Sequence, residues 1–369
     1  MYVTSTNLVH YLIARGHVTR HSVVSGEFSV TEVAGRNRSF RVARGDDRSL
    51  FVKQIKELDQ TTIDSLRREA VCYRVTSDRR FDLLSEITPS FVDYDPLRHL
   101  LIVELIVDAE NLTQCHRRLG SYPEVLARRL GKALAAVHEA FRELPLGELD
   151  ESLFPGHPPW SFSFHEQDAH TLNPALQQLL GIVRADDRFC QELDSLRDGW
   201  QADGLIHGDS KWSNCLVSPD ENEQPRIHLI DWELADLGDP LWDIAGVLQG
   251  YLSEWILHAS LDNESTPEEF LQNFGDLFSS MQPAMRGLWR SYNARLTDQD
   301  ESPERVLRCM RYVGARMLMT VIEYLNWSGG LDHNRMTMIG FSRKILCDPR
   351  EAASLVLGIE TARQDEPTA

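Results

Sequence analysis

The segment from Gly204 to Ala245 constrains this chain more than any other part of its sequence. It contains a His-Gly-Asp tripeptide ending at Asp209, an asparagine at position 214, and two apolar runs separated by turn residues, the second ending at Asp231. Such runs predict a β-hairpin. Because the residue entering the first strand of a hairpin lies beside the residue leaving the second, Asn214 and Asp231 are predicted to be neighbours.

Two oxygen ligands, one amide and one carboxylate, with a second carboxylate close by indicate a particular chemistry. Amide and carboxylate oxygens, together with phosphate oxygens, are the ligands that Mg²⁺ prefers. A further carboxylate, Asp209, near a substrate hydroxyl would complete the groups needed for phosphoryl transfer, where positioning and charge neutralisation do most of the catalysis. The residues therefore predict a magnesium-dependent phosphotransferase.

Three ordered motifs resemble a known family. They are His207 to Asn214, then Ile230-Asp231-Trp232-Glu233, then Gly238-Asp239-Pro240-Leu241-Trp242-Asp243-Ile244-Ala245. This pattern resembles the aminoglycoside phosphotransferase and choline kinase branch of the protein-kinase-like fold. The resemblance implies an α+β, bilobal chain. Residues 1–106 would form an N-lobe with a small antiparallel sheet and one helix, and residues 107–369 a mainly helical C-lobe with the catalytic loop, the metal site and the acceptor-binding helices.

The resemblance also implies roles for individual residues. Asp209 would orient the acceptor hydroxyl and accept its proton, Asn214 would belong to the catalytic loop, and Asn214 with Asp231 would bind Mg²⁺. Asp243 usually braces the catalytic loop in such proteins. Lys211 would neutralise the γ-phosphate during transfer.

The N-terminal part supplies the expected nucleotide-binding residues. Lys53 lies in a predicted strand, and Glu69 follows sixteen residues later in a predicted helix. They match the kinase lysine that binds the α- and β-phosphates of ATP and the glutamate that holds it. The stretch containing Glu104 and Ile106 would be the hinge, whose main-chain groups bind adenine.

The coarse secondary structure agrees with this division. Strands are predicted at 27–33, 39–43, 49–54, 91–93 and 100–107. Three helices are also predicted: one opened by a capping box at Thr61–Asp64, with Leu66, Ala70 and Tyr73 on its apolar stripe, one carrying Val125, Leu130, Leu134, Val137 and Phe141, and one from Val306 to Leu325. His138, Trp212 and Trp232 are expected to be core residues. The acidic run 298–301 is expected to be a solvated loop, and residues 365–369 a frayed end.

Two departures from the family pattern bear on the acceptor. The loop 34–38 has one glycine where protein kinases have three, which leaves its phosphate-binding residues open. Lys211 stands where small-molecule kinases of the branch often have histidine and Ser/Thr kinases have lysine. Residues 23–42 and 207–215 also resemble kinase-like proteins of ribosomal peptide natural-product pathways, of the lanthipeptide and thioamide kind, in which a partner lyase acts on the phosphorylated residue.

The leading hypothesis for the acceptor is therefore Ser/Thr of a peptide in such a pathway. The alternative is a small molecule, an aminoglycoside-like antibiotic or another hydroxylated metabolite. An alternative of another class is a pseudokinase, a binding module without transfer activity.

Composition narrows the classes of partner. The 369 residues carry a net charge of −18, which argues against a protein that grips nucleic acid through its phosphates. The six cysteines form no closely spaced pair, which is typical of free thiols in a reducing cytoplasm. No run approaches the roughly 18 apolar residues of a membrane span, so we expect no membrane partner and a cytoplasmic location.

Overall fold

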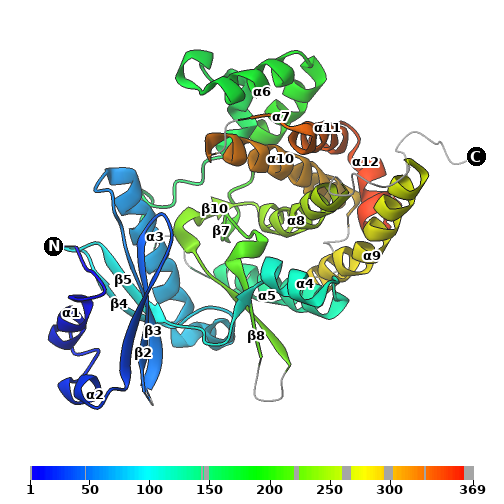
Figure 1. The fold of residues 1–369 in the computed structure, drawn as a ribbon. Coiled ribbons are helices and arrows are strands. Elements are labelled where there is room, and N and C mark those ends of the chain that lie inside the picture. The colour runs from blue at the N-terminus through cyan, green and yellow to red at the C-terminus, as the bar shows by residue number, and fades with distance from the viewer. Residues whose placement is uncertain are drawn as a thin grey trace, which may run out of the picture. The chain divides into compact units, whose positions relative to one another are not determined.

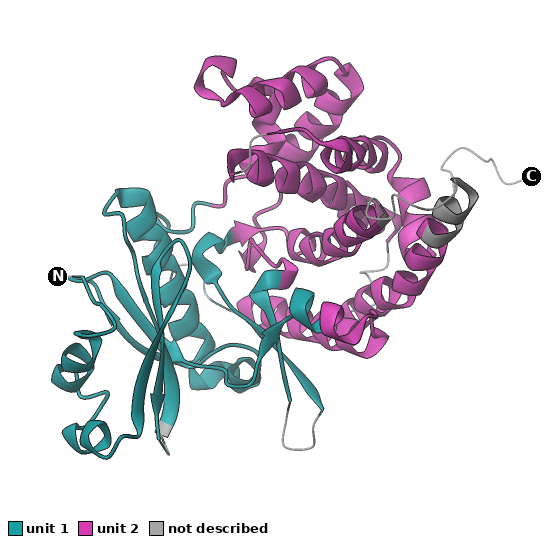
Figure 2. Ribbon diagram, in the orientation of Figure 1, with its two compact units in different colours: residues 1–115, 144–155, 213–236 teal, residues 116–143, 156–212, 237–369 magenta. Residues whose placement is uncertain are grey.

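The chain divides into two compact units. The computed structural model describes residues 2–45, 47–142, 144, 149–219, 224–259, 267–294, 302–327 and 330–360. One unit is formed by residues 1–115, 144–155 and 213–236, and the other by residues 116–143, 156–212 and 237–369 (Figure 2). The boundary expected between residues 106 and 107 stays a prediction. The predicted loop 298–301 and the predicted frayed end 365–369 lie outside the described residues.

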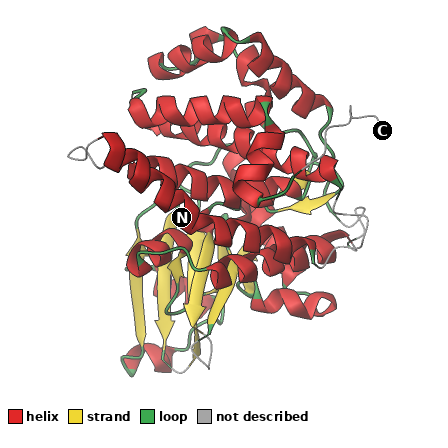
Figure 3. Cartoon of the chain, turned by 90° about the vertical axis from the view of Figure 1, so that its right-hand side faces the viewer, coloured by secondary structure: helices red, strands yellow, loops and turns green. Residues whose placement is uncertain are grey.

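The first unit is built around a five-stranded antiparallel sheet of order β1-β2-β3-β5-β4 (Figures 1 and 3). A second, three-stranded sheet has the order β6-β8-β9. The elements of this unit are α1 (Leu8–Ala14), α2 (Arg20–Val24), β1 (Phe28–Val33), β2 (Arg38–Arg44), β3 (Asp47–Gln54), α3 (Gln60–Thr76), the 3-10 helix η1 (Arg79–Glu86), β4 (Phe91–Asp95), β5 (Leu100–Glu104), β6 (Glu110–Asn111), β8 (Cys215–Pro219), β9 (Pro225–Leu229) and the 3-10 helix η6 (Trp232–Leu234). The predicted small antiparallel sheet and the predicted hairpin are both present.

The two faces of the five-stranded sheet differ, because one face packs in the apolar core and the other carries Lys53. Successive side chains of a strand point to opposite faces. On β2, β3 and β5, the even-numbered residues pack with Leu8 and Leu12 of α1 in one apolar core; they are Phe40, Val42, Leu50, Val52, Leu100 and Ile102. The register pairs Lys53 with Ser39 and Leu101, so the odd-numbered residues share the other face.

The start of α3 differs from the prediction. The expected capping box at Thr61–Asp64 is wrong, because the N-cap is Asp59, whose carboxylate accepts from the Thr62 amide at 3.0 Å and the Thr62 hydroxyl at 2.6 Å. A carboxylate two residues earlier competes better for the free amides of the first turn. The predicted stripe is correct, since Leu66, Ala70 and Tyr73 are buried. The strand predicted to reach residue 107 ends at Glu104.

The second unit is mainly helical. The division falls within α4 (Leu112–Leu119) and within the 3-10 helix η5 (Trp212–Asn214). The elements that follow are α5 (Glu124–Arg142), η3 (Trp160–Glu166), η4 (Ala169–Thr171), α6 (Pro174–Arg184), α7 (Asp187–Asp198), β7 (Gly204–Ile206), β10 (Asp236–Gly238), α8 (Leu241–Ala259), α9 (Pro267–Asn293), α10 (Pro303–Trp327), α11 (His333–Cys347), α12 (Pro349–Ala352) and the π-helix η7 (Ala353–Leu357). Helix α5 packs against α9, and α10 packs against α8 and α11 (Figure 1). Among the described helices, none has the length and apolar character needed to cross a bilayer.

The predicted apolar stripes of α5 and α10 are confirmed except at one residue. The prediction for Val125 is wrong, because this residue is 49% exposed and the neighbouring Leu126 is buried instead. Val125 lies in the first turn of α5, and the exact position of a helix end is the least certain part of a prediction from periodicity. The stripe of α10 from Val306 to Leu325 is buried throughout.

Gly131 allows α5 and α9 to approach closely. A Cβ atom at this position would lie 2.4 Å from the carbonyl oxygen of Leu288, whereas a Cβ at Gly181 of α6 would meet nothing within 4 Å. We expect Gly131→Ala to lower the free energy of unfolding by about 1–3 kcal/mol through overpacking. The control Gly181→Ala should raise it by about 0.5–1 kcal/mol, because alanine favours a helix interior. Urea unfolding of both variants checks this, and equal effects would contradict it.

Candidate active site

Lys53 is the centre of a buried charge cluster in the first unit. Its Nζ donates to Glu69 Oε2 at 2.7 Å and to Asp231 Oδ1 at 2.6 Å, and Glu233 Oε2 lies 3.5 Å away. Lys53 and Glu69 are only 8% and 3% exposed. The sheet register aims Lys53 away from the apolar core, and α3 presents Glu69 on the same side. The expected pairing of Lys53 with Glu69 is therefore present.

The surroundings shift the pKa of both members of this pair. Burial disfavours the ammonium of Lys53, but Glu69, Asp231 and Glu233 outweigh it and hold its pKa well above the ordinary value. Burial raises the pKa of Glu69 to about 7, against the opposing pull of Lys53. In this cluster the ammonium of Lys53 is held by three carboxylates, those of Glu69, Asp231 and Glu233.

The β8–β9 hairpin brings Asn214 and Asp231 to its open end. The Ile230 amide donates to the Asn214 carbonyl at 3.0 Å, just beyond the pairing of Cys215 with Leu229. Asp231 follows with a left-handed φ of 67°, and its amide donates to the Tyr73 hydroxyl at 3.1 Å. A non-glycine residue held in this conformation is strained and is a candidate for function. The amide and carboxylate oxygens of this pair are the donor types that suit Mg²⁺.

A cavity of about 410 Å³ opens beside this cluster, within the first unit. This volume is sufficient for a cofactor-sized ligand. Its lining combines an apolar part with a charged part; the apolar residues include Val33, Phe51, Leu101, Val103, Leu105, Leu216 and Ile230, and the charged ones include Lys53, Glu69, Asp231 and Glu233. Such a lining offers apolar contacts to a flat ring and a cation, Lys53, to an anion.

The predicted hinge residues Glu104 and Ile106 both line the cavity. The Glu104 carboxylate forms an ion pair with Arg48 at 2.8 Å, and the Leu105 amide donates a hydrogen bond to the Ser49 carbonyl at 2.8 Å. The Glu104 side chain therefore forms an ion pair with Arg48, and adenine binding by the main chain at this stretch stays a prediction.

The loop between β1 and β2 contributes a charged side chain that sequence reasoning left unassigned. Gly35, Arg36 and Asn37 line the cavity, and Arg36 Nη1 lies 3.5 Å from Glu233 Oε1. Glu233 therefore lies between two cations, Lys53 and Arg36. Arg36 places positive charge at the cavity in a loop that lacks two of the three expected glycines.

In the second unit, the buried carboxylate of Asp243 holds the His-Gly-Asp loop. Its Oδ2 accepts from the His207 amide at 2.8 Å and contacts His138 Nε2 at 2.9 Å, and its Oδ1 accepts from the Gly208 amide at 3.0 Å. Burial opposes the charge of Asp243, but the hydrogen bond from His138 and the nearby His207 keep its pKa below the ordinary value. His138 also contacts the Tyr292 hydroxyl at 3.0 Å, so the predicted core histidine is buried with both ring nitrogens bonded.

Asp209 and Lys211 form an ion pair on this loop. Lys211 Nζ lies 2.8 Å from Asp209 Oδ2, and the Lys211 amide donates to the Asp209 carbonyl at 2.8 Å. Asp209 is 5% exposed, while the Lys211 side chain is 43% exposed. Burial disfavours the ammonium of Lys211, yet Asp209, helped by Glu323, raises its pKa above the usual value. A carboxylate and a cation that reaches solvent thus lie side by side.

Sequence reasoning missed Arg316 of α10. Its Nη1 donates to the Gly208 carbonyl at 3.1 Å, and its Nη2 lies 3.4 Å from Asp209 Oδ1. The signal was available, since an arginine between the apolar residues of a helix stripe must have a buried partner. Which partner it has could not be deduced from sequence.

An aromatic cluster packs beneath the loop. Trp212, which is 5% exposed, has its ring centroid 4.6 Å from that of His116 and 4.7 Å from that of Tyr251, and its Nε1 donates to the Val247 carbonyl at 3.1 Å. The prediction that Trp212 packs in the core is confirmed, and so is that for Trp232, which is fully buried. Burial among these rings lowers the pKa of His116 to about 4.

His116 should make the fold sensitive to mild acid. Its pKa is lower in the folded than in the unfolded state, so its contribution to stability is present above about 6.5 and is lost as the pH falls toward 4. We expect wild type to lose about 2 kcal/mol of its free energy of unfolding at pH 5 relative to pH 7 from this residue. His116→Phe should lose correspondingly less, as measured by urea unfolding at both pH values. An unchanged pH dependence would contradict this assignment.

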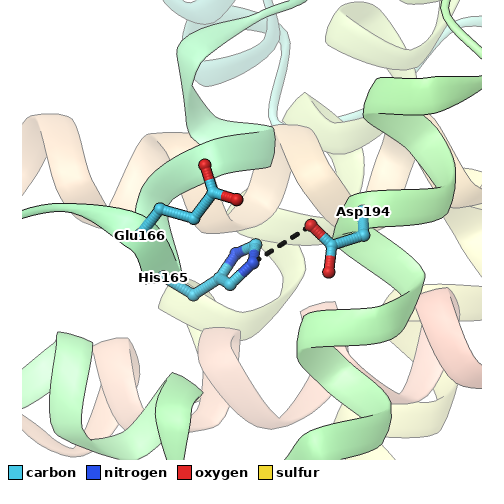
Figure 4. A group of neighbouring side chains, drawn as sticks. All are labelled: His165, Glu166 and Asp194. Atoms are coloured by element: carbon cyan, nitrogen blue, oxygen red, sulfur yellow. Dashed lines mark ion pairs between the residues drawn. The ribbon is translucent and has the colours of Figure 1, made fainter.

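A separate cluster of His165, Glu166 and Asp194 has metal-ligand spacing (Figure 4). His165 Nε2 lies 3.2 Å from Asp194 Oδ1. Arg197, however, pairs with Glu166 at 2.7 Å and with Asp194 at 2.9 Å. Because this guanidinium already neutralises both carboxylates, a metal ion would have to displace it, and we assign the cluster to surface ion pairing.

Comparison with known proteins identifies the kind of chain. A family model described as "Phosphotransferase enzyme family" matches residues 29–288. A curated relative, "Probable acyl-CoA dehydrogenase IBR3" from Arabidopsis thaliana, is 37% identical over 67 residues. That match covers 18% of this chain and only 7% of the relative, so this chain spans a small part of that protein's length.

Solved structures share the fold at low sequence identity. The GDP complex of wild-type aminoglycoside 2'-phosphotransferase-IIIa is 15% identical with a TM-score of 0.54, covering 94% of this chain and 100% of that one. Amicoumacin kinase hAmiN, in complex with AMP-PNP, Ca²⁺ and Ami, is 14% identical with a TM-score of 0.53, covering 91% and 96%. A choline/ethanolamine kinase family protein from Mesorhizobium loti is 17% identical with a TM-score of 0.51, covering 94% and 97%. The predicted α+β, kinase-like fold is confirmed.

Proposed function

The chain belongs to the phosphotransferase enzyme family, and from this premise we propose that it transfers the γ-phosphate of ATP to a hydroxyl group with the help of Mg²⁺. The observation that carries the proposal is the cluster of Lys53 with Glu69 and Asp231 at the wall of the 410 Å³ cavity. A buried lysine fixed by a glutamate from the neighbouring helix is what kinases use to bind the α- and β-phosphates.

The first unit would bind the nucleotide. Lys53 neutralises the α- and β-phosphates while Glu69 keeps its side chain in place, and main-chain groups of Glu104 and Ile106 bind the base. Asn214 and Asp231 supply the oxygen ligands for Mg²⁺, which when bound neutralises charge on the phosphates. The donor types fit, and the Asp231 side chain is 35% exposed, so it is accessible to a ligand.

The second unit would act on the acceptor. Asp209 orients the acceptor hydroxyl and takes its proton as the hydroxyl oxygen bonds to the γ-phosphorus and the bond to the β-phosphate oxygen breaks. Lys211 offsets the negative charge of the transferred group. Asp243 acts through the loop, since its carboxylate holds the amides of His207 and Gly208.

The leading proposal for the acceptor is Ser/Thr of a peptide in a natural-product pathway, with a partner lyase acting afterwards. It is supported by Lys211, which contacts Asp209 directly and remains partly exposed. A hydroxylated small molecule is the second candidate, and it is favoured by what the names of two neighbours state, an aminoglycoside phosphotransferase and an amicoumacin kinase.

Mass spectrometry of MgATP reactions tests the proposal. Wild type is offered Ser/Thr-rich peptides, aminoglycosides and choline-like alcohols in separate reactions, each with an EDTA control. We expect one class to gain a phosphate in the presence of Mg²⁺ and none with EDTA. ATP binding without phosphorylation of any acceptor or release of ADP would favour a pseudokinase, a binding module of the same fold.

A further inference from the structure

Arg316 is the most deeply buried cation of the second unit that contacts the proposed catalytic loop. Its side chain is 4% exposed, and it comes from α10, more than a hundred residues after the loop in sequence. Burying a guanidinium is costly unless it is paired and hydrogen-bonded. Arg316 lies in an otherwise apolar helix stripe, so the groups that it contacts must offset the cost of its burial.

Those partners belong to the loop that carries Asp209, and one of them is the Asp209 carboxylate itself. The fork of the guanidinium reaches two adjacent residues, with Nη1 on the Gly208 carbonyl at 3.1 Å and Nη2 at 3.4 Å from Asp209 Oδ1. Lys211 meets the other carboxylate oxygen, Oδ2, at 2.8 Å. The two carboxylate oxygens of Asp209 therefore have different partners. Oδ1 faces the buried Arg316, and Oδ2 faces the partly exposed Lys211.

The guanidinium itself is held firmly in place. It lies over the ring of Trp242, with Cζ 4.9 Å from the centroid, and Trp242 Nε1 donates to the same Gly208 carbonyl at 3.1 Å. Gly246 leaves the necessary room, because a Cβ there would lie 2.9 Å from Arg316 Nη2. Stacking and a bidentate fork are properties of arginine that lysine does not share.

We propose that Arg316 is a positioning residue for phosphate transfer, which sets the orientation of the Asp209 carboxylate through its contacts with Gly208 and Asp209. The proposal rests on the role proposed above for Asp209. A displacement of about 1 Å at a reacting group can cost about a hundredfold in rate. Of the two contacts that Arg316 makes with the loop, the hydrogen bond to the Gly208 carbonyl at 3.1 Å is shorter than the 3.4 Å contact with the Asp209 carboxylate. The Gly208 bond is therefore the stronger of the two.

The test compares Arg316→Gln and Arg316→Lys with wild type. The matched control is Arg311→Gln on the same helix, because Arg311 is 37% exposed and pairs with Glu192 at 3.6 Å instead of the loop. MgATP affinity is measured by calorimetry. Turnover is measured by ADP formation, with water as the acceptor and with the acceptor class that gains a phosphate in the mass-spectrometry reactions proposed above. We expect Arg316→Gln to lower kcat by about a hundredfold with the MgATP affinity within about twofold of wild type. The kcat of Arg316→Lys should lie between those of Arg316→Gln and wild type. The kcat of Arg311→Gln should equal that of wild type.

The double variant Asp209→Asn/Arg316→Gln separates positioning from a general structural role. If Arg316 acts through Asp209, the double variant is no slower than Asp209→Asn alone. A further hundredfold loss, or an Arg316→Gln enzyme as fast as wild type, would overturn the proposal. The melting temperatures of wild type, Asp209→Asn, Arg316→Gln and the double variant measure the coupling of the pair separately from turnover. Coupled melting temperatures with wild-type turnover in Arg316→Gln would show a structural pair only and would overturn the positioning role.

The two failures are distinguishable. An Asp209→Asn enzyme that keeps full turnover would contradict the proposed function and with it the role of Arg316. An inactive Asp209→Asn enzyme beside a fully active Arg316→Gln enzyme would contradict only the role of Arg316.

Discussion

Asp209→Asn is expected to lower the turnover number for phosphate transfer by about a thousandfold while the affinity for MgATP stays close to that of wild type. The amide has nearly the shape of the carboxylate but cannot accept the proton of the acceptor hydroxyl. The groups proposed to bind the nucleotide, Lys53 and Asp231, belong to the first unit and are unchanged. Product formation by mass spectrometry and MgATP binding by calorimetry measure the two quantities separately.

The control for this variant is Asp203→Asn, which makes the same chemical change at an exposed residue shortly before the loop. It should behave as wild type in both measurements. If Asp209→Asn kept wild-type turnover, Asp209 could not be the group that accepts the proton. If instead it lost nucleotide binding together with turnover, its effect would extend beyond the acceptor.

Lys53→Met is expected to have the second large effect, on both activity and stability. Without the ammonium, Glu69 is left as a buried carboxylate with no cation, and breaking a buried pair in this way costs roughly 3–5 kcal/mol. Turnover should fall by more than about a hundredfold, because the α- and β-phosphates lose their fixed positive charge. Urea unfolding and the rate of ADP formation measure these two losses.

The double variant Lys53→Met/Glu69→Gln should recover much of the stability but none of the activity. The pH dependence offers a second check. Burial raises the pKa of Glu69 to about 7, and removal of Lys53 removes an interaction that lowers it. A carboxyl group with a raised pKa in the folded state stabilises the fold at low pH and loses that contribution as the pH rises. The deficit of Lys53→Met should therefore be smaller at pH 5 than at pH 8, and a larger deficit at pH 5 would contradict this account.

Two kinds of signal made part of the site predictable from sequence. The pairing of Lys53 with Glu69 followed from the resemblance to kinases, which keep such a lysine on a strand and such a glutamate on the helix after it. The pairing of Asn214 with Asp231 followed from the hairpin, because a turn between two apolar runs determines which residues are neighbours.

The parts that sequence could not predict depend on packing between distant elements. Arg316 reaches Gly208 from α10, and the contact of Glu233 with Arg36 joins η6 to the β1–β2 loop. Neither leaves a periodic signal in the chain. The errors at Asp59 and Val125 concern helix ends, where several residues compete for the same free amides or the same patch of core.

The division of labour between the two faces of the five-stranded sheet has an evolutionary consequence. Substitutions on one face change the core and those on the other change the cavity, so the two can diversify independently. A single-residue insertion or deletion within β3 would instead exchange the faces, turning Lys53 into the core and Val52 into the cavity. We therefore expect insertions and deletions in the segments between the strands, such as the β1–β2 and β2–β3 turns, and changes by substitution within the strands themselves.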